Sequence, residues 1–418
     1  MALVVHKYGG TSVGSIDRIR AVADRVARVH AGGDKVVVVV SAMAGETNRL
    51  FKLAAQLSDS PHPRETDVLV ATGEQVSAAL LAIRLQALGY PTVSFLAHQL
   101  KLATDSHHGN AKIRSVEAVR LTAALADGNI AVVAGYQGVD PKGDITTLGR
   151  GASDLTAVAL AAALKADACE IYTDVEGVFT ADPRIVPGAR KLAAVTYEEM
   201  LELAASGAKV LALRSVEYAR NHGVPIHVRS SFSDVDGTWI VKEEDVLEQA
   251  LISGIASDSG EAKVTILAVP DHPGVAARVF RPLADAGIHI DMIVQNVSAA
   301  GHTDISFTLP EADLATAEPV LGVIAKHVDA QGYVCDTDIG KVSLVGAGMR
   351  SNPGVAADMF EALADAGINI EIISTSSIRI SCVVRSSELE RAVQVVHDRF
   401  RLSENVLLLH EAPGDTPS

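Results

Sequence analysis

Short runs of apolar, mostly β-branched residues alternate with helical patterns in the first half of the chain. The runs fall at Leu3–Val5, Lys35–Val40, Ile130–Ala134 and Cys169–Thr173, and the second of them reads KVVVVV. A continuous apolar run of this length is typical of a strand that is covered on both faces. From Ser15, a suitable helix N-cap, apolar residues recur at helical spacing. The pattern predicts a mostly parallel α/β sheet with helices on both sides.

A second pattern begins beyond residue 250 and is present twice. Segments 263–298 and 341–376 both contain PGVAA followed by LADAGI. These motifs recur 80 positions apart, whereas the opening Lys-Val pairs at Lys263 and Lys341 are 78 apart, so the second copy has two extra residues in its first loop. Each copy predicts a strand, a turn, a helix that begins near the Pro-Gly, and another strand. Because one such unit buries little core, we expect the two copies to pack together.

These patterns divide the chain into three predicted domains. An α/β domain covers residues 1–250, and its exit is the polar, glycine-containing segment 231–245. The two repeats define smaller α+β domains at residues 255–335 and 336–412, and an exchange of strands between them is left open. Several domains also fit a length of 418 residues, which exceeds the usual size of a single core.

Composition and charge narrow the range of partners. Hydrophobic residues make up 48% and charged residues 21% of the chain, which is typical of a compact soluble protein. The 51 acidic and 36 basic residues give a net charge of −15, which argues against binding to nucleic acid or to an anionic membrane. We find no run of about 18 apolar residues and no signal peptide, so we expect no membrane span. Any polyanionic ligand must therefore meet a few well-placed basic residues in one cleft.

Cysteine and histidine give no sign of a metal site. Cys169, Cys335 and Cys382 are far apart and odd in number, which predicts reduced thiols and a cytoplasmic location. The 14 histidines do not show ligand spacing. The pair His107-His108 lies in the polar stretch TDSHHGN and is interpreted as part of a loop.

Two glycine-containing turns are candidate anion sites. The segment KYGGTS at 7–12 follows the first strand and precedes the first helix, so its backbone N–H groups can approach a phosphate and Lys7 can add charge. It is not a Walker A loop, because G-x-x-x-x-G-K-[ST] is absent. The segment TLGRGASD at 147–154 precedes a helix at Leu155–Leu164, which Ser153 or Asp154 can cap. Arg150 suits bidentate binding of a carboxylate.

Two further segments carry candidate chemistry. The polar loop Tyr172–Arg184 follows a buried strand, and ligands of open α/β sheets bind at the carboxyl ends of strands. Lys209 lies close to a glycine in SGAKVL, where a lysine can meet phosphates. On its own, each of the four segments is also compatible with a purely structural role.

In combination, the four segments resemble the amino acid kinase family. VVSAM at 39–43, GETN at 45–48 and TGEQ at 72–75 make the chain similar to the aspartate kinases of that family. The C-terminal repeats resemble ACT domains, which are regulatory modules that bind amino acids. The resemblance runs through nearly the whole chain. It implies a mostly parallel, three-layer α/β/α catalytic domain followed by two ferredoxin-like ACT domains.

The resemblance also implies a reaction and the residues that perform it. The γ-phosphate of ATP, bound with Mg²⁺, would pass to the β-carboxylate of L-aspartate and give 4-phospho-L-aspartate, the first step towards lysine, diaminopimelate, threonine and methionine. The implied catalytic residues are Lys7, Asp154 and Arg150. The implied aspartate site contains Ser41, Thr47, Glu74 and Arg150. The implied ATP site contains Lys7, Gly9, Gly10, Thr173, Asp174, Asp182, Arg184 and Lys209. No side chain is assigned to a metal.

Elementary chemistry agrees with these roles. A substrate carboxylate with a pKa of about 4 is already ionised at neutral pH, so no general base is needed. The obstacle is the approach of one anion to another, which cationic groups and helix N-termini relieve. Arg150 would bind the α-carboxylate of aspartate, and Glu74 would lie near its ammonium group.

The sequence departs from the family pattern in three places. Ala152 stands where a second glycine is usual, and its methyl group could crowd the backbone if φ is positive. Ala212-Leu213 replaces a usual His-Pro, and Glu176 replaces a usual aspartate. None of the three removes a phosphate ligand, so we expect an active enzyme.

For the C-terminal pair, the resemblance implies feedback inhibition by lysine, threonine or both, within a homodimer or homotetramer. The matching positions in the first copy are Asp271, Gly274, Val275, Ala276 and Gln295. Those in the second copy are Asn352, Gly354, Val355, Asn369, Ile370 and Thr375. The identity of the effector stays open, and so does the interpretation that the repeats are only structural.

Three other functions remain at this point. A glutamate kinase has the same fold, but the motif set and the ACT pair count against it. An inactive amino-acid sensor is opposed by the presence of Lys7, Arg150, Asp154 and Lys209, although Ala152 keeps it open. A Rossmann dehydrogenase is remote, because no G-x-G-x-x-G follows a strand.

Overall fold

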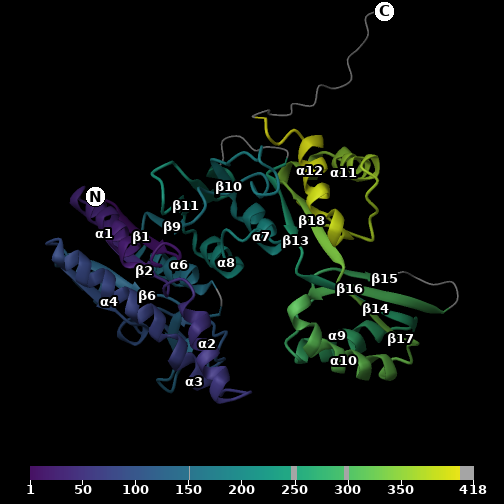
Figure 1. The fold of residues 1–418 in the computed structure, drawn as a ribbon, viewed down its shortest axis with the longest axis horizontal. Helices are drawn as coiled ribbons and strands as arrows, with labels where there is room; N and C mark the ends of the chain where they lie inside the picture. Colours follow the sequence, from purple (N-terminus) through teal and green to yellow (C-terminus); the bar gives the residue numbers. More distant parts are fainter. Residues whose placement is uncertain (150, 246–251, 296–300, 405–418) are drawn as a thin grey trace, which may run out of the picture. The chain divides into compact units, whose positions relative to one another are not determined.

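A computed structural model describes residues 1–149, 151–245, 252–295 and 301–404 (Figure 1). The chain forms two compact units. The first contains residues 1–179, 191–204 and 209–248, and the second contains residues 180–190, 205–208 and 249–418. Two short segments from the first 250 residues therefore pack with the C-terminal part of the chain.

The first unit is organised around an eight-stranded sheet, as the apolar runs predict. All of its neighbouring strands are parallel except β11 and β12. The strand order is β10 (Ala194–Thr196), β12 (Thr238–Val241), β11 (Ile226–Ser230), β9 (Ala168–Thr173), β1 (Leu3–Tyr8), β2 (Lys35–Val40), β6 (Ile130–Ala134) and β3 (Thr92–Phe95). Five of the six residues of β2 are buried, because both faces of this central strand are covered.

Helices cover both faces of the sheet. On one face, α1 (Ile16–Ala31) and α4 (Thr72–Ala87) pack on alternate residues of β2 and β6. On the other face, α6 (Ala152–Leu164) contacts β1, β2 and β9 and also packs on α8 (Leu213–His222). Ser15 caps α1 as predicted, because its hydroxyl accepts a hydrogen bond from the Arg18 N–H at 3.3 Å. The three-layer α/β/α architecture is confirmed.

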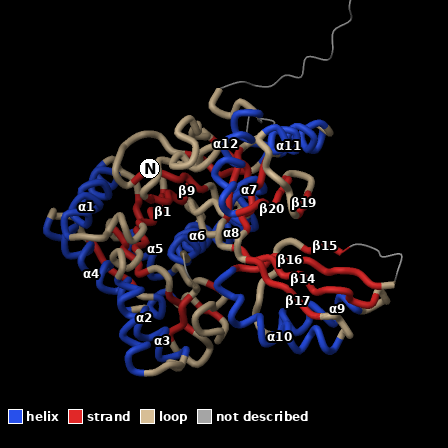
Figure 2. Tube along the Cα trace, turned by 45° about the vertical axis from the view of Figure 1, so that its right-hand side comes forward, coloured by secondary structure: helices blue, strands red, loops and turns tan. Residues whose placement is uncertain are grey.

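A small four-stranded sheet lies at the edge of this unit. Its strand order is β5 (Ile113–Ser115), β4 (Ala103–Thr104), β7 (Gln137–Val139) and β8 (Ile145–Thr147). The remaining helices of the unit are α2 (Glu46–Leu57), α3 (Pro63–Val70), α5 (Val119–Ala126) and α7 (Tyr197–Ala205), with 3₁₀ turns η1 (Ala97–Leu100) and η2 (Glu243–Asp245). Helix α3 contacts β8 of this small sheet, and Figure 2 shows unlabelled short strands beside α2 and α3.

One helical stretch of the described chain is long and apolar enough to cross a membrane by length and composition. It runs from Pro63 to Ala87 through α3 and α4, and its most apolar window has a mean hydropathy of 1.5. Half of that window is buried within the protein, and α4 packs against α1, β3 and β6. We therefore interpret the stretch as a core element of the α/β unit.

The second unit contains two antiparallel sheets, each covered by two helices. One sheet has the order β15 (Ile293–Gln295), β16 (His302–Pro310), β14 (Glu261–Pro270) and β17 (Gly332–Asp336), with helices α9 (Val275–Asp285) and α10 (Leu314–His327). The other has the order β13 (Gly254–Asp258), β18 (Ile339–Val345), β20 (Arg379–Arg385) and β19 (Ile372–Thr375), with helices α11 (Gly354–Asp365) and α12 (Leu389–Arg399). The 3₁₀ turns are η3 (Glu311–Asp313), η4 (Ala347–Ser351) and η5 (Ser386–Glu388). The predicted repeat of strand, turn, helix and strand is present in both.

The strand β13 shows that the two modules are interleaved along the chain. It precedes the first repeat, yet it pairs antiparallel with β18 of the second. The first module therefore lies between two parts of the second module in sequence. The exact domain limits near residues 250, 335 and 412 stay predictions.

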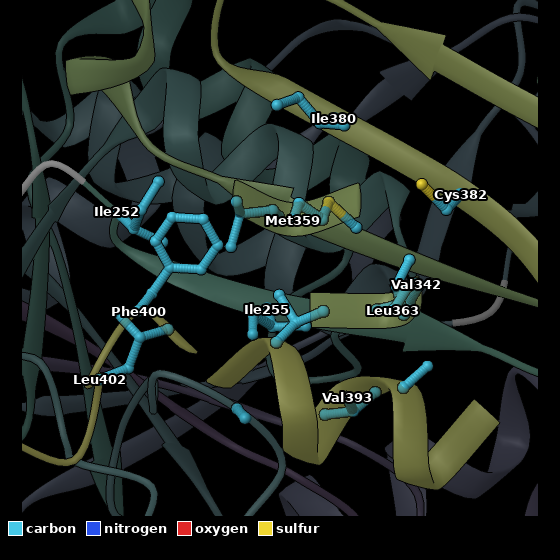
Figure 3. Close-up of a cluster of buried hydrophobic side chains, with 14 of the residues drawn as sticks. Ile252, Ile255, Val342, Met359, Leu363, Ile380, Cys382, Val393, Phe400 and Leu402 are labelled. Atoms are coloured by element: carbon cyan, nitrogen blue, oxygen red, sulfur yellow. The ribbon is translucent and has the colours of Figure 1, made fainter. Parts of the chain in front are cut away.

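The core of the second module draws in residues from outside the repeat. Figure 3 shows Ile252 and Ile255 beside Phe400 and Leu402, with Met359 nearby. The same cluster of buried side chains includes Ala181 and Val186 from the segment 180–190. The Thr180 hydroxyl lies 3.0 Å from His397 Nε2, and the Thr180 carbonyl accepts a 2.7 Å hydrogen bond from the Ile255 N–H. This segment is therefore built into the second module.

Charged pairs connect the two modules reciprocally. Lys263 of the first copy bonds to Glu371 of the second, and Lys341 of the second bonds to Asp291 of the first. The lysines occupy matching positions in the repeat, and so do the two acids. Burial alone would lower the pKa of Lys341, but the carboxylates of Glu261 and Asp291 raise it above the usual value. The internal repeat thus forms a pseudo-symmetric pair.

Candidate active site

Lys7 lies near the carboxyl end of β1, the central strand of the large sheet. Its strand neighbours His6 and Tyr8 point to the opposite face, since side chains alternate along a strand. Tyr8 packs with α1 and α4, whereas Lys7 faces α6. The ammonium group therefore points at the N-terminal end of the buried helix α6. The helix dipole makes this end positive, so a cation there needs a negatively charged partner.

The turn after β1 is held close to the backbone of neighbouring loops. The Gly9 N–H donates to the Tyr172 carbonyl at 3.2 Å, and the Gly10 carbonyl accepts from the Ala44 N–H at 3.1 Å. A side chain at Gly10 would place its Cβ 3.0 Å from the Ala42 carbonyl oxygen. Glycine is needed here because the two backbone segments nearly touch.

Lys7 forms an ion pair with Asp154, which lies in the first turn of α6. The Lys7 Nζ and Asp154 Oδ1 atoms are 2.6 Å apart, and the two side chains are only 11% and 8% exposed. A carboxylate in the first turn also interacts favourably with the helix dipole. This geometry supports the prediction that Asp154 orients Lys7.

Glu74 is a second buried charge and is incompletely paired. It lies in the first turn of α4 and is 3% exposed. Its Oε1 accepts a 3.0 Å hydrogen bond from the Ala42 N–H, whereas within the described chain Oε2 has no hydrogen-bond partner. Burial raises the pKa of Glu74 to about 7, and the backbone hydrogen bond from Ala42 opposes this only in part. Such a carboxylate is suited to receive a cationic group.

A pocket of about 340 Å³ brings most of these residues together. It lies at the carboxyl ends of β1 and β2, where open α/β sheets bind ligands. Its lining residues are Lys7, Gly10, Ser41, Ala42, Met43, Ala44, Gly45, Thr47, Asn48, Phe51, Glu74, Tyr136, Gly151, Ala152 and Ser153. The predicted residues Lys7, Gly10, Ser41, Thr47 and Glu74 thus share one cavity.

Three lining residues escaped the sequence analysis, and the first of them, Ala44, lies between the motifs at 39–43 and 45–48. Phe51 lies on α2, one turn after Thr47. Tyr136 follows β6 and has a φ of 69°, which is unusual for a residue with a side chain. The position of Tyr136 just after a buried strand could have predicted its place in the pocket, because the ends of strands line such pockets.

The other predicted nucleotide residues lie outside the lining of this pocket. Thr173 ends β9 and Asp174 follows it, and their side chains bond to each other at 3.1 Å. Lys209 is exposed in the loop after α7. Asp182 and Arg184 belong to the second unit, where they form a 2.6 Å ion pair that holds the pKa of Asp182 below its usual value. Their roles with ATP stay predictions.

The family departures can be examined at three positions. Ala152 is the first residue of α6 and has no positive φ, so its methyl group fits a helical backbone. The preceding Gly151 has a φ of 74°, and a Cβ there would lie 3.3 Å from Ala212 Cβ. Glu176 Oε1 accepts a 3.3 Å hydrogen bond from the Ser233 hydroxyl. Arg150 lies outside the described residues.

The predicted effector positions gather around matching parts of the two modules. Gly274, with a φ of 92°, and Gly354 lie at the starts of α9 and α11. Val275 and Val355 are buried in the cores of their modules, so only their backbone is available to a ligand. Ala276 lies in the first turn of α9. The other positions lie in the turns beside these helices and along the edge strands that follow, namely Asp271, Gln295, Asn352, Asn369, Ile370 and Thr375.

Protein side chains do not form a ready metal site in the described part of the chain. Among those residues, no group of three His, Cys, Asp or Glu side chains converges. The cysteines Cys169, Cys335 and Cys382 carry free thiols, and burial raises the pKa of each. The pocket instead combines a buried cation with backbone N–H groups at a glycine turn, which is the chemistry of an anion-binding site.

Comparison with known proteins identifies the class to which this fold and pocket belong. The profile of the amino acid kinase family matches residues 2–230. The profile of the ACT domain matches residues 267–322 and 342–400. The first match contains the pocket and every strand of the large sheet except β12. The second match falls in both C-terminal modules.

Individual relatives are more specific. An aspartate kinase of Pseudomonas putida is 53% identical over 403 residues, which are 96% of this chain and 98% of that protein. An aspartokinase of Mycolicibacterium smegmatis is 54% identical over 409 residues, which are 96% of this chain and 97% of that protein. The crystal structure of E. coli aspartokinase III with aspartate and ADP has a TM-score of 0.81 and 26% identity, and the match covers 95% of this chain and 99% of that one. The chain therefore belongs to the amino acid kinase family, and to the aspartate kinases within it.

Proposed function

We propose that the pocket binds L-aspartate beside the γ-phosphate of MgATP and produces 4-phospho-L-aspartate and ADP. The observation that carries this proposal is one cavity that contains both a buried lysine and a carboxylate with an unpaired oxygen. Lys7 suits the transferred phosphoryl group, and Glu74 suits the ammonium group of an amino acid. The complex of E. coli aspartokinase III with aspartate and ADP supports the same pair of ligands.

The reaction needs charge neutralisation more than acid–base chemistry. The β-carboxylate is already ionised, so an oxygen lone pair attacks the γ-phosphorus while the bond to the bridging oxygen breaks and its electrons leave with ADP. Lys7 offsets the negative charge that accumulates as the two anions meet. Asp154 holds Lys7 in place through the 2.6 Å ion pair. Mg²⁺ enters with the nucleotide and neutralises its phosphates.

The substrate side of the pocket is assigned to three side chains. Ser41 follows β2, Thr47 lies in the first turn of α2, and Glu74 lies in the first turn of α4, so three separate elements surround the ligand. Hydroxyl groups and the Gly10 N–H can hold carboxylate or phosphate oxygens, whereas a phosphate at Gly9 would have to compete with the Tyr172 carbonyl for its N–H. In this proposal, Arg150 binds the α-carboxylate of aspartate. The residues assigned to ATP are Thr173, Asp174, Asp182, Arg184 and Lys209.

Trapping the acyl phosphate tests the reaction directly. With hydroxylamine, MgATP and aspartate, we expect a stoichiometric hydroxamate, because an acyl phosphate is readily attacked by this amine. Glutamate in place of aspartate should give little product. A higher rate with glutamate would indicate a glutamate kinase, and no hydroxamate with either amino acid would indicate an inactive sensor.

We also propose that lysine, threonine or both inhibit the enzyme through the ACT pair. Two ACT modules are present, and E. coli aspartokinase III has been crystallised in a T-state with lysine and aspartate. Such inhibition fits an enzyme at the start of the pathway to lysine, diaminopimelate, threonine and methionine. A cytoplasmic homodimer or homotetramer is the corresponding assembly.

The effector proposal predicts a linked change in activity and stability. Millimolar lysine, threonine or their mixture should lower the rate and raise the melting temperature, since a ligand that binds only the folded state stabilises it. At a hundredfold excess over Kd the gain is about 2.7 kcal/mol. The D-enantiomers serve as controls and should change neither the rate nor the melting temperature. Unchanged activity and melting temperature with every combination would contradict the proposal.

A further inference from the structure

Asp67 of α3 is a buried carboxylate that accepts hydrogen bonds from two distant parts of the first unit. It is 2% exposed. On one side, Oδ2 lies 2.9 Å from His108 Nδ1, and the Gly109 N–H donates to both oxygens at 3.1 and 3.0 Å. On the other side, the Thr147 hydroxyl donates to Oδ1 at 2.6 Å and the Thr147 N–H to Oδ2 at 3.1 Å. The carboxylate therefore joins a loop to the end of β8.

Arg214 of α8 also binds this region. Its guanidinium donates to the Leu148 carbonyl at 2.6 Å, to the Asn110 side chain at 2.9 Å and to the Ala111 carbonyl at 2.9 Å. A Cβ at Gly149 would lie only 2.9 Å from Asn110 Oδ1. The turn after β8 is thus held between two charged side chains from different helices.

These contacts connect Asp67 to two parts of the pocket lining, namely Glu74 and residues 151–153. Asp67 and Glu74 are seven positions apart on the nearly continuous helical stretch from Pro63 to Ala87, which is about 10 Å and two turns on the same face. Thr147 lies four residues before Gly151, and residues 151–153 line the same pocket as Glu74. The Gln137 amide donates to the Ala71 carbonyl at 3.2 Å and fixes the junction between α3 and α4.

We propose that Asp67, acting through Thr147, is a positioning residue that sets the distance between Glu74 and the pocket wall at residues 151–153. Its carboxylate fixes the helix that carries Glu74 relative to the strand that leads into this wall. The spacing of the two walls then determines how well an amino acid fits between them. The inference rests on the proposed function, because it assumes that aspartate binds beside Glu74.

The inference predicts a selective effect on one substrate. Lys7 belongs to β1, the glycine turn follows that strand, and neither is among the bonding partners of Asp67 given above. A shift of α3 moves Glu74, whereas α6, which carries Asp154, is held by its packing on β1, β2, β9 and α8. We therefore expect weaker aspartate binding with little change in ATP binding or in the chemical step. A misplacement of about 1 Å in a binding site can cost up to about a hundredfold. A residue needed only for folding would lower the melting temperature without this selectivity.

The experiment compares Thr147→Val with Thr147→Ser in the full-length enzyme. Valine keeps the shape of threonine but removes the hydroxyl that bonds to Asp67, whereas serine keeps it. We expect Thr147→Val to raise the KM for aspartate about tenfold, with kcat and the KM for ATP changed less than about threefold. Thr147→Ser should behave as the wild type. Asp67→Asn, which disturbs both sides of the link, should raise the KM for aspartate further.

Glu199→Gln provides a matched control. Glu199 is 4% exposed, and its carboxylate accepts bonds from the N–H and the hydroxyl of Thr196 at 3.1 and 2.9 Å, but it does not line the pocket. This variant should lose stability without any change in the KM for aspartate. Glu74→Gln is measured in parallel, because it tests the binding site itself.

The outcomes separate the inference from the proposed function. If Glu74→Gln raises the KM for aspartate and Thr147→Val does not, the positioning role of Asp67 is wrong and the binding site stands. If Glu74→Gln also leaves this KM unchanged, the binding site is wrong as well. Equal changes in the KM values of both substrates for Thr147→Val would show a structural role only and overturn the inference.

Discussion

Replacing Lys7 with methionine is expected to lower kcat by about a thousandfold or more while the fold is retained. The reason is that Lys7 is the buried cation of the pocket, and removing a group that stabilises charge in the transition state costs two to three orders of magnitude or more. Steady-state rates with saturating aspartate and MgATP measure the effect. Lys35→Met, at the exposed start of β2, is the control and should change neither rate nor stability.

The same substitution leaves Asp154 buried without its partner, which by itself costs about 3–5 kcal/mol of stability. The double variant Lys7→Met with Asp154→Asn removes both charges and should recover most of the melting temperature. It should not recover activity. This pair of variants separates catalysis from folding. A Lys7→Met enzyme that keeps more than about a tenth of the wild-type kcat would contradict the role of Lys7.

The sequence predicts the parts of the fold that depend on local pattern. The runs at Leu3–Val5 and Lys35–Val40 become central strands because their residues are apolar on both faces. The glycine turn after β1 and the two repeats are local as well, so their positions can be read from the chain. Five of the predicted residues meet in one pocket because each lies at or just after the end of a strand, or in the first turn of a helix.

Features that depend on distant partners could not be predicted in this way. Strand β13 pairs with β18, more than 80 positions later, and the residues of β13 do not indicate this partner. The packing of segment 180–190 into the second module likewise depends on residues that are distant in sequence. Asp67 has an unremarkable sequence context, and its importance appears only when His108 and Thr147 are brought to it. Side-chain networks of this kind come from tertiary structure alone.

The departure at Ala152 shows how local geometry decides the effect of a substitution. The expected crowding required a positive φ, and the structure places that conformation at Gly151 instead. Ala152 begins the helix, where a methyl group is favourable. The second glycine of the family pattern is therefore dispensable in this chain, and the interpretation as an inactive sensor loses its main support.

Replacing Glu74 with glutamine is expected to weaken aspartate binding and, at alkaline pH, to stabilise the free enzyme. The loss of the bond between the carboxylate and an ammonium group, worth about 1.5–3 kcal/mol, should raise the KM for aspartate by about ten- to a hundredfold. The effect on ATP should be small. Glu117→Gln, an exposed glutamate paired with Lys101, is the control.

The stability effect follows from the pKa of Glu74, which burial raises from 4.5 to about 7. Because the folded protein holds this proton more tightly than the unfolded chain, the protonated group contributes stability that is fully present below pH 4.5. That contribution is lost as the pH rises to about 7. Glutamine does not titrate, so the melting temperature of Glu74→Gln relative to wild type should be similar at pH 5 and clearly higher at pH 8.

The same titration governs binding by the wild-type enzyme. Below pH 7 the free enzyme carries a neutral Glu74, which attracts an ammonium group poorly, so kcat/KM for aspartate should fall as the pH is lowered through about 7. In Glu74→Gln this fall should be absent, since the group responsible is gone. An unchanged aspartate KM in the variant would show that the buried carboxylate of Glu74 does not receive the substrate. The same stability difference at pH 5 and pH 8 would show that the pKa of Glu74 is not raised in the folded protein.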